Sequence, residues 1–243
     1  MEEFVYGTGK RIFINTALGC NANCKYCYLP HLGYERKKKV ISGETAVQIL
    51  RNMSCFEEGK NGTIISIGCY SECLDKQNMK ETKKIIQNIL PLGNNVQLAT
   101  KQSVTEEVCK LIERNRIFTE QMKVYISMPT VSLISQMEPG TVPVELRIRN
   151  IENCMKYNIP VVLYIKPFMD KITDLDLEQY INILKTYKIP VVVGGYLYTE
   201  KADMVADVGN GRLYETDHIE ERKKFVHELK KYSKVYEHST ELL

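Results

Sequence analysis

The sequence predicts an α/β protein whose parallel sheet curls into a partial (β/α)6 barrel of the TIM type. Two patterns carry this prediction. Six short runs rich in Val and Ile are apolar almost throughout, as in strands of a parallel sheet that is covered on both faces. They alternate with six longer stretches whose apolar residues recur three and four positions apart, which is the spacing of one helix face. Six βα units in a row favour right-handed crossovers and an open barrel rather than a closed one of eight strands.

The predicted strands are short, β-branched and poor in charge. Pro160 and Pro190 stand at the start of the last two, where a missing backbone N–H is tolerated. In chain order the strands are Arg11–Thr16, Thr63–Ile67, Asn95–Ala99, Lys123–Ser127, Pro160–Lys166 and Pro190–Gly194.

The predicted helices fill the intervals between the strands and follow the last one. Ser42 is a candidate N-cap for the first helix, and the second ends before Pro91. Ser103 precedes the third, and Glu106 lies three residues later in the spacing of a capping box. The helices are Gly43–Phe56, Met79–Leu90, Val104–Asn115, Pro143–Tyr157, Leu175–Tyr187 and Ile219–Tyr232.

Composition and length narrow the class of protein. No Gly/Ser-rich linker interrupts the pattern, so we expect a single domain over residues 1–243, with a core of about 11–195 and a C-terminal extension over 196–243. No run approaches 18 apolar residues, which argues against a membrane span. The N-terminus is acidic and lacks the apolar region of a secretory signal, so we expect a cytoplasmic protein. A net charge of +3 is too small to indicate nucleic-acid binding.

Three cysteines follow the first predicted strand in the spacing C-x3-C-x2-C: Cys20, Cys24 and Cys27. Three thiolates from one loop suit a [4Fe–4S] cluster with one iron open to an outside ligand, whereas ferredoxin clusters use four cysteines. A zinc site in a non-catalytic interaction module is the alternative. Zinc prefers four N/S ligands, commonly as two close pairs, and no second C-x2-C pair exists here. A Cys or His from elsewhere in the chain would have to complete that site.

The cysteine spacing, with Tyr26 in the aromatic position before the third cysteine, resembles the signature of the radical SAM superfamily. The resemblance implies that the open iron binds the amino and carboxylate groups of S-adenosylmethionine (AdoMet). It also implies that one electron splits the sulfonium to give a 5′-deoxyadenosyl radical, which abstracts hydrogen from a substrate. A one-electron reductant of the flavodoxin or ferredoxin type is the implied partner.

Polar residues follow the predicted strands at the edge where barrel enzymes place their chemistry. Ser71 and Glu72 come after the second strand and offer oxygens to an ammonium group. Lys101, after the third strand, suits a carboxylate, and Ser127 ends the fourth. Of the other cysteines, Cys109 and Cys154 lie on predicted helices and are expected in the core.

A more specific resemblance, to the spore photoproduct lyase branch, runs from about Arg11 to Gly195. It rests on CKYCYLPHLG, IGCYSECLD, LATK, YISMPT and MEPGTVPVELRIRNI, the last with Glu138, Pro139 and Arg147 in the family's EP…R positions. The resemblance implies cofactor contacts by Ser71, Lys101 and Ser127, and aromatic shielding by Tyr26 and Tyr28. It implies that Cys69 donates a hydrogen atom to the product radical, with Cys73 as a second candidate.

The substrate is left open by the sequence. Only 19 residues precede Cys20, whereas the lyases carry a substantial N-terminal region, and their C-terminal DNA-contacting part is not recognisable here. Together with the small net charge, this favours a peptide or small metabolite over DNA. Lyase-type repair of thymine photoproducts in DNA stays the alternative within the radical SAM reading.

Overall fold

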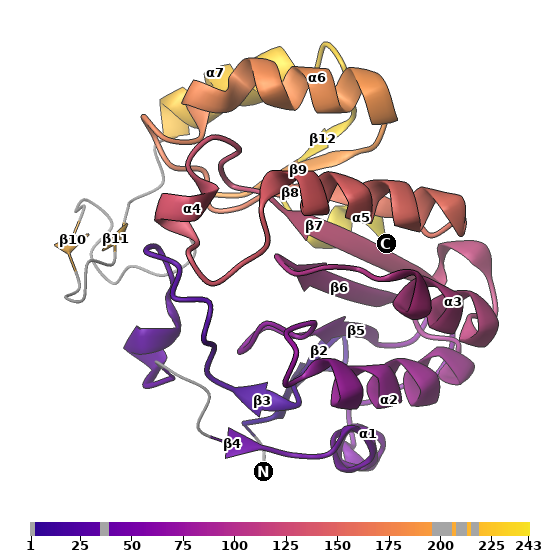
Figure 1. Cartoon of the computed structure of the whole chain (residues 1–243). Coiled ribbons are helices and arrows are strands. Elements are labelled where there is room, and N and C mark those ends of the chain that lie inside the picture. Colours follow the sequence, from indigo (N-terminus) through magenta and orange to yellow (C-terminus); the bar gives the residue numbers. More distant parts are fainter. Residues whose placement is uncertain (1–2, 35–38, 196–205, 208–212, 215–218) are drawn as a thin grey trace.

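Six parallel strands form the centre of the fold, in a computed structural model that describes residues 3–34, 39–195, 206–207, 213–214 and 219–243. These strands are β2 (Arg11–Ile14), β5 (Ile64–Ile67), β6 (Val96–Thr100), β7 (Met122–Ser127), β8 (Val161–Ile165) and β9 (Val191–Val193). Each pairs in parallel with the next, and all six coincide with predicted strands. The sheet is curved and open, with helices along its outer side (Figure 1), so the predicted partial barrel is confirmed.

Two short edge strands extend this sheet, and neither was predicted. β1 (Val5–Thr8) pairs antiparallel with β2, and β12 (Val235–Tyr236) pairs in parallel with β9. Both are short, partly exposed segments in polar sequence, so they carry no strand pattern of their own. Two further strand pairs stand apart from the sheet: β3 (Ala17–Leu18) with β4 (Lys39–Val40), and β10 (Ala206–Asp207) with β11 (Leu213–Tyr214).

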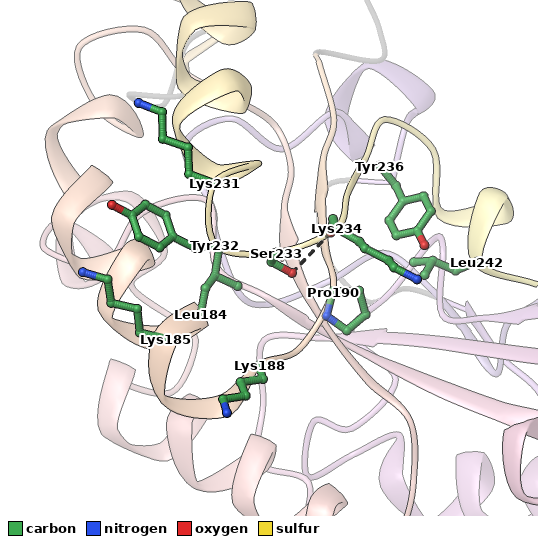
Figure 2. A pocket seen from close by; sticks show the side chains of 10 residues that line it. All are labelled: Leu184, Lys185, Lys188, Pro190, Lys231, Tyr232, Ser233, Lys234, Tyr236 and Leu242. Carbon is green, nitrogen blue, oxygen red and sulfur yellow. Dashed lines mark hydrogen bonds between the residues drawn. The ribbon is translucent and has the colours of Figure 1, made fainter.

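β12 closes one wall of a basic groove of about 710 Å³ beside the starting end of β9 (Figure 2). Four lysines line it: Lys185, Lys188, Lys231 and Lys234. The groove therefore lies at the edge of the sheet opposite the carboxyl ends of the parallel strands. Of the predicted extension 196–243, residues 196–205, 208–212 and 215–218 lie outside the described part of the chain.

All six predicted helices are present, with ends that differ by up to four residues. They are α1 (Gly43–Asn52), α2 (Met79–Ile89), α3 (Glu106–Asn115), α5 (Val144–Lys156), α6 (Leu177–Tyr187) and α7 (Ile219–Leu229). A short helix that was not predicted, α4 (Ile134–Met137), lies between β7 and α5. None of the helices in the described residues is long and apolar enough to cross a bilayer.

The helix caps confirm one prediction and correct another. The Ser42 hydroxyl accepts a hydrogen bond from Thr45 N at 3.1 Å, as expected of an N-cap. The predicted cap at Ser103 is wrong, because the N-cap of α3 is Thr105, whose hydroxyl accepts a hydrogen bond from Val108 N. Val104 is buried and its N–H donates to the Asn150 side chain at 2.7 Å, which holds this segment against α5 in a non-helical conformation.

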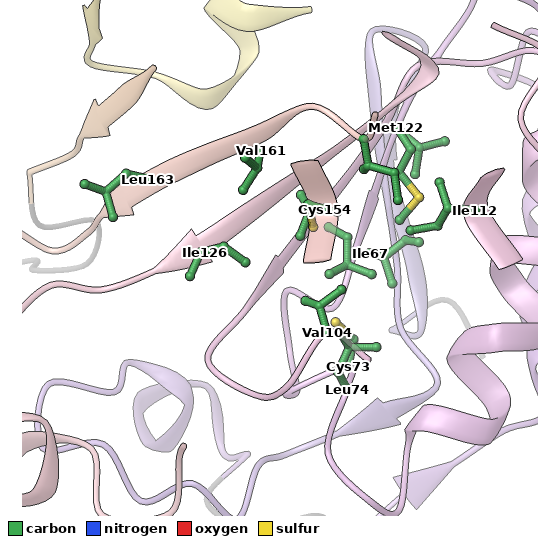
Figure 3. Close-up of a cluster of buried hydrophobic side chains, with 14 of the residues drawn as sticks. Ile67, Cys73, Leu74, Val104, Ile112, Met122, Ile126, Cys154, Val161 and Leu163 are labelled. Carbon is green, nitrogen blue, oxygen red and sulfur yellow. The ribbon is translucent and has the colours of Figure 1, made fainter. Parts of the chain in front are cut away.

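The two faces of the sheet differ in chemistry. Residues such as Ile67, Ile126 and Leu163 point toward the helices and form the apolar core (Figure 3). Cys154 of α5 lies in this core and Cys109 is also fully buried, so their predicted core placement is confirmed. Successive residues of a strand face opposite sides, and the inner side carries polar and aromatic groups instead. Members of that inner face are Arg11, Phe13, Ser66, Gln97, Tyr125 and Tyr164.

The cap of α3 provides a test of the helix boundary. Replacing Thr105 by Ala removes the side-chain acceptor at the N-terminus and is expected to lower the free energy of unfolding by about 1 kcal/mol. Ser103→Ala is the matched control and should change it by less than about 0.5 kcal/mol. Urea unfolding followed by circular dichroism measures both. The reverse order of effects would restore Ser103 as the cap.

Candidate active site

The cysteine loop lies at the carboxyl ends of the strands, between β3 and a 3-10 helix over Leu29–Leu32. Gly19 has φ of 93°, a conformation that favours glycine, and its N–H donates to Tyr70 O at 2.9 Å beyond the end of β5. On the other side, Gly140 N donates to Ala22 O at 2.8 Å. A Cβ on Gly140 would stand 2.6 Å from Ala22 Cα, so only glycine permits this approach. The loop is thus fixed by backbone contacts at both ends.

The three cysteines form no disulfide within the described residues and lie in a partly apolar environment. Cys24 is buried against Met137 and Met169, while Cys20 and Cys27 are half-buried. Burial raises the pKa of the Cys20 thiol to about 11 and that of Cys24 well above its ordinary value. A bound metal cation would supply the positive charge that stabilises the thiolate forms of these cysteines.

The arrangement of the thiols bears on the kind of metal group they fit. Among the described residues, no three His, Cys, Asp or Glu side chains converge on a position for a single metal ion. A zinc ion needs its ligands about 2.3 Å from one centre, whereas the cysteines of a [4Fe–4S] cluster bind separate irons. Three thiols from one loop suit a cluster with one open iron, whereas a zinc ion would need a fourth ligand from elsewhere in the chain.

A buried ion pair anchors the aromatic residue of the cysteine motif. The Tyr26 hydroxyl donates to the carboxylate of Glu138, which pairs with Arg147 at 2.6 Å. Both charged side chains are 0% exposed. Desolvation raises the pKa of Glu138 to about 7, although the Arg147 charge opposes the shift. Lys101 Nζ lies 4.0 Å from the same carboxylate.

Glu138 and Arg147 were not among the predicted site residues, although their segment resembled the EP…R part of a known family. The sequence did not indicate that either residue contacts the cysteine loop, because 111 positions separate Cys27 from Glu138 in the chain. Two features of the sequence could have drawn attention to them: the glutamate stands directly before a Pro-Gly turn, and the arginine lies inside a predicted helix. Only the fold shows that the pair joins α5 to Tyr26.

Ser71, Lys101 and Ser127 lie at the carboxyl ends of three neighbouring strands, β5, β6 and β7. Adjacent strands are about 4.8 Å apart, so the structure brings these predicted residues together at one edge. The hydroxyls of Ser71 and Ser127 are buried, and neither has a hydrogen-bond partner among the described residues. Buried hydroxyls are normally paired, so these two mark a position where a bound ligand would supply the partners.

The Glu72 carboxylate accepts its hydrogen bonds from protein donors and does not face an open position. Its carboxylate accepts from Thr100 Oγ1 at 2.5 Å and from Lys101 N at 2.9 Å. It also accepts from Leu74 N at 3.3 Å. Desolvation raises its pKa above the ordinary value. The Glu72 carboxylate therefore holds the segment after β5 against the end of β6, directly before Lys101.

Tyr28, Cys69 and Cys73 differ in their surroundings. The Tyr28 hydroxyl donates to Cys69 O at 2.5 Å, so Tyr28 packs on the segment after β5. Cys69 is half-buried, and burial raises the pKa of its thiol to about 11. Cys73 is 2% exposed and directs its thiol to Ala99 O at 3.6 Å within the core. Of the two cysteines, Cys69 is the more exposed residue.

The fold of this chain is similar to the folds of several solved structures. Spore photoproduct lyase complexed with dinucleoside spore photoproduct has a TM-score of 0.66 at 13% identity, over 90% of this chain and 74% of the lyase. A lyase mutant with bound AdoMet and the same dinucleoside has a TM-score of 0.66 at 12% identity, over 93% and 76%. SuiB of Streptococcus suis bound to S-adenosylmethionine has a TM-score of 0.69 at 11% identity, over 99% of this chain and 53% of SuiB.

At these identities the structural likenesses show a shared fold. A sequence comparison with curated proteins finds no match. The family comparison is more decisive, because the model of the Radical SAM superfamily matches residues 14–184, from the end of β2 to α6. That match spans well over half of the sequence, and the chain therefore belongs to the radical SAM superfamily.

Proposed function

We propose that Cys20, Cys24 and Cys27 hold a [4Fe–4S] cluster whose fourth iron binds AdoMet, and that the chain uses this pair for radical chemistry on a substrate. Membership of the superfamily implies an enzyme with such a cluster and AdoMet. When bound, the cluster supplies the electron that splits AdoMet into methionine and the 5′-deoxyadenosyl radical. A flavodoxin- or ferredoxin-type protein is the proposed electron donor, and the reducing cytoplasm is the proposed location.

The observation that carries this proposal is the pair of buried, unpartnered hydroxyls on either side of Lys101. We assign Ser71 to the amino group of AdoMet and Lys101 to its carboxylate, because an oxygen accepts from an ammonium and a lysine pairs with a carboxylate. Ser127 is assigned to ribose or carboxylate oxygens. Within the described residues, Lys101 Nζ lies 4.0 Å from the Glu138 carboxylate and 5.7 Å from the centre of the Tyr26 ring, so its charge has no close ion-pair partner there.

Tyr26 and Tyr28 are assigned to shielding the cofactor. Each ring is held by its hydroxyl, Tyr26 to Glu138 and Tyr28 to the carbonyl of Cys69. Tethered rings lose little entropy when a ligand packs on them, and they exclude water from the reacting groups.

Cys69 is assigned to quenching the product radical. Because burial raises its pKa to about 11, the side chain is a protonated thiol at neutral pH, and the S–H bond is what a hydrogen-atom donor needs. The S–H bond breaks, a C–H bond forms on the product, and a thiyl radical stays on Cys69. A one-electron reductant and a proton then restore the thiol. Cys73, enclosed in the core, is unsuited to this step.

The substrate is proposed to be a small metabolite or peptide rather than DNA. The net charge of +3 is the supporting observation, since proteins that bind nucleic acids present a strong basic surface. The lyase likeness at 12–13% identity supports a shared fold only. The zinc-module alternative is disfavoured by the lack of a second C-x2-C pair in the sequence and by the family match over residues 14–184.

Cluster assembly tests the metal assignment. After anaerobic reconstitution the full chain should be brown, contain about four irons, and form 5′-deoxyadenosine with AdoMet and dithionite. Cys24→Ala should lose both iron and AdoMet cleavage. The control Cys55→Ala removes a half-buried thiol outside the loop and should keep both. Colourless protein containing zinc, or full cleavage by Cys24→Ala, would contradict the proposal.

The two unpartnered hydroxyls give a separate test. Ser71→Ala and Ser127→Ala should each weaken AdoMet binding about fivefold, the equivalent of one net hydrogen bond of about 1 kcal/mol. Neither should lower the free energy of unfolding of the unliganded protein, since the hydroxyls have no hydrogen-bond partner to lose in the part of the chain that the structure describes. Calorimetric titration and urea unfolding measure the two effects. Ser54→Ala, on the exposed surface, should change neither quantity. Unchanged AdoMet affinity in both site variants would remove these residues from the cofactor site.

A further inference from the structure

The carboxylate of Glu138 lies among three donors that compete for its two oxygens. Its Oε2 forms the ion pair with Arg147 Nη1 at 2.6 Å, and its Oε1 accepts the hydroxyl of Tyr26. The third donor is the Lys101 ammonium, whose Nζ lies 4.0 Å from the same Oε1. That distance is too long for a hydrogen bond, so the two nearer donors hold the carboxylate, and only charge attracts Lys101 to it.

Arg147 is fixed in its place by further contacts. Its Nε donates to Val142 O at 3.1 Å, its Nη1 to Ser127 O at 2.8 Å and its Nη2 to Thr141 Oγ1 at 2.5 Å. The side chain is 0% exposed. Because a guanidinium is planar, contacts at all three nitrogens set its orientation. Arg147 is therefore a rigid partner for Glu138.

The backbone of Lys101 is fixed on both sides, which places its ammonium beside this carboxylate. Its N–H donates to Glu72 Oε2 at 2.9 Å, and its carbonyl accepts from Val142 N at 3.2 Å. The side chain is 21% exposed, and Nζ lies 5.7 Å from the centre of the Tyr26 ring. Lys101 thus starts from a fixed point and reaches toward both Glu138 and Tyr26.

The distances decide which cation neutralises Glu138. A buried carboxylate requires a cation beside it, and Arg147 at 2.6 Å meets this requirement. Among the described residues, Lys101 is the other cation within ion-pair distance of Glu138. In the absence of Arg147, a small movement of the flexible lysine stem would close the gap of 4.0 Å. Lys101 would then become the structural partner of Glu138.

We propose that Arg147 and the Tyr26 hydroxyl are positioning groups that occupy Glu138 and thereby keep the Lys101 ammonium available for the carboxylate of AdoMet. The inference rests on the proposed function, which assigns that carboxylate to Lys101. Glu138 is tethered beside Lys101 and so has a high effective concentration, whereas AdoMet has to bind from solution. Arg147 and Tyr26 remove this competitor from within the chain.

AdoMet binding to the anaerobically reconstituted full chain, measured by calorimetry without reductant, tests the proposal. Arg147→Met should weaken AdoMet binding about tenfold, the equivalent of one hydrogen bond to a charged group. Adding Glu138→Gln to that variant removes the competitor and should restore the affinity to within about threefold of the unmodified chain. The double variant still lacks the Arg147 contacts with Ser127, Thr141 and Val142, so recovery cannot come from them.

Decarboxylated AdoMet is the matched probe, because it keeps the adenosine, the sulfonium and the amino group and lacks the carboxylate. Its affinity should change by less than about threefold in Arg147→Met. The control is Arg149→Met, an exposed position on α5, which should bind both ligands as the unmodified chain does. Two results would overturn the inference: an equal loss of both ligands in Arg147→Met, or no recovery of AdoMet binding when Glu138→Gln is added.

Tyr26→Phe tests the same idea without removing a buried charge, and it decides the matter where Arg147→Met fails to fold. Phenylalanine keeps the ring and frees Glu138 Oε1, the atom that lies 4.0 Å from Lys101 Nζ. AdoMet binding should weaken about threefold, and binding of decarboxylated AdoMet should not change. Unchanged AdoMet binding in Tyr26→Phe would contradict the proposal.

Iron content and the variant Lys101→Met, measured in the same series, separate this inference from the proposed function. An unmodified chain that assembles no cluster or binds no AdoMet contradicts the proposed function. AdoMet binding that is unaffected by Lys101→Met contradicts the assignment of the carboxylate to this lysine. If both hold and Arg147→Met shows no selective loss of AdoMet, only the positioning role of Arg147 is contradicted.

Discussion

The buried ion pair between Glu138 and Arg147 is the interaction on which the candidate site depends. Arg147 donates to Ser127 O at the end of β7, and Glu138 accepts from Tyr26 in the cysteine loop. One pair therefore connects a helix, a strand end and a loop that has little regular structure of its own. Removing either partner would leave an uncompensated charge inside the protein, at a cost of about 3–5 kcal/mol. The position of the cysteines relative to the sheet follows from this contact.

The sheet divides its chemistry between two faces. Its outer face, with Ile67, Ile126 and Leu163, buries apolar surface under the helices and stabilises the fold. Its inner face carries Arg11, Gln97 and other polar groups, which hydrogen-bond to one another across neighbouring strands. Because side chains alternate along a strand, one short segment performs both tasks.

Much of the fold was predictable, since hydrophobic spacing records helices and strands directly. The six central strands and six main helices were found where they were predicted. β1 and β12 were missed because edge strands of two to four residues are defined by pairing with β2 and β9 and not by local pattern. The cap of α3 was misplaced for a similar reason: Asn150, 46 positions after Val104, holds the chain before the helix.

By itself, the sequence determined the three-cysteine motif on which the cluster proposal rests, and the order of the strand-end residues. The spacing of Cys20, Cys24 and Cys27 is local, so it is complete within one loop. Only the tertiary structure decided how distant side chains meet: it paired Glu138 with Arg147 and brought Glu138 to Tyr26 of the cysteine loop. The physical reason is that burial and charge pairing depend on which segments the folded sheet places side by side, and no local pattern records that.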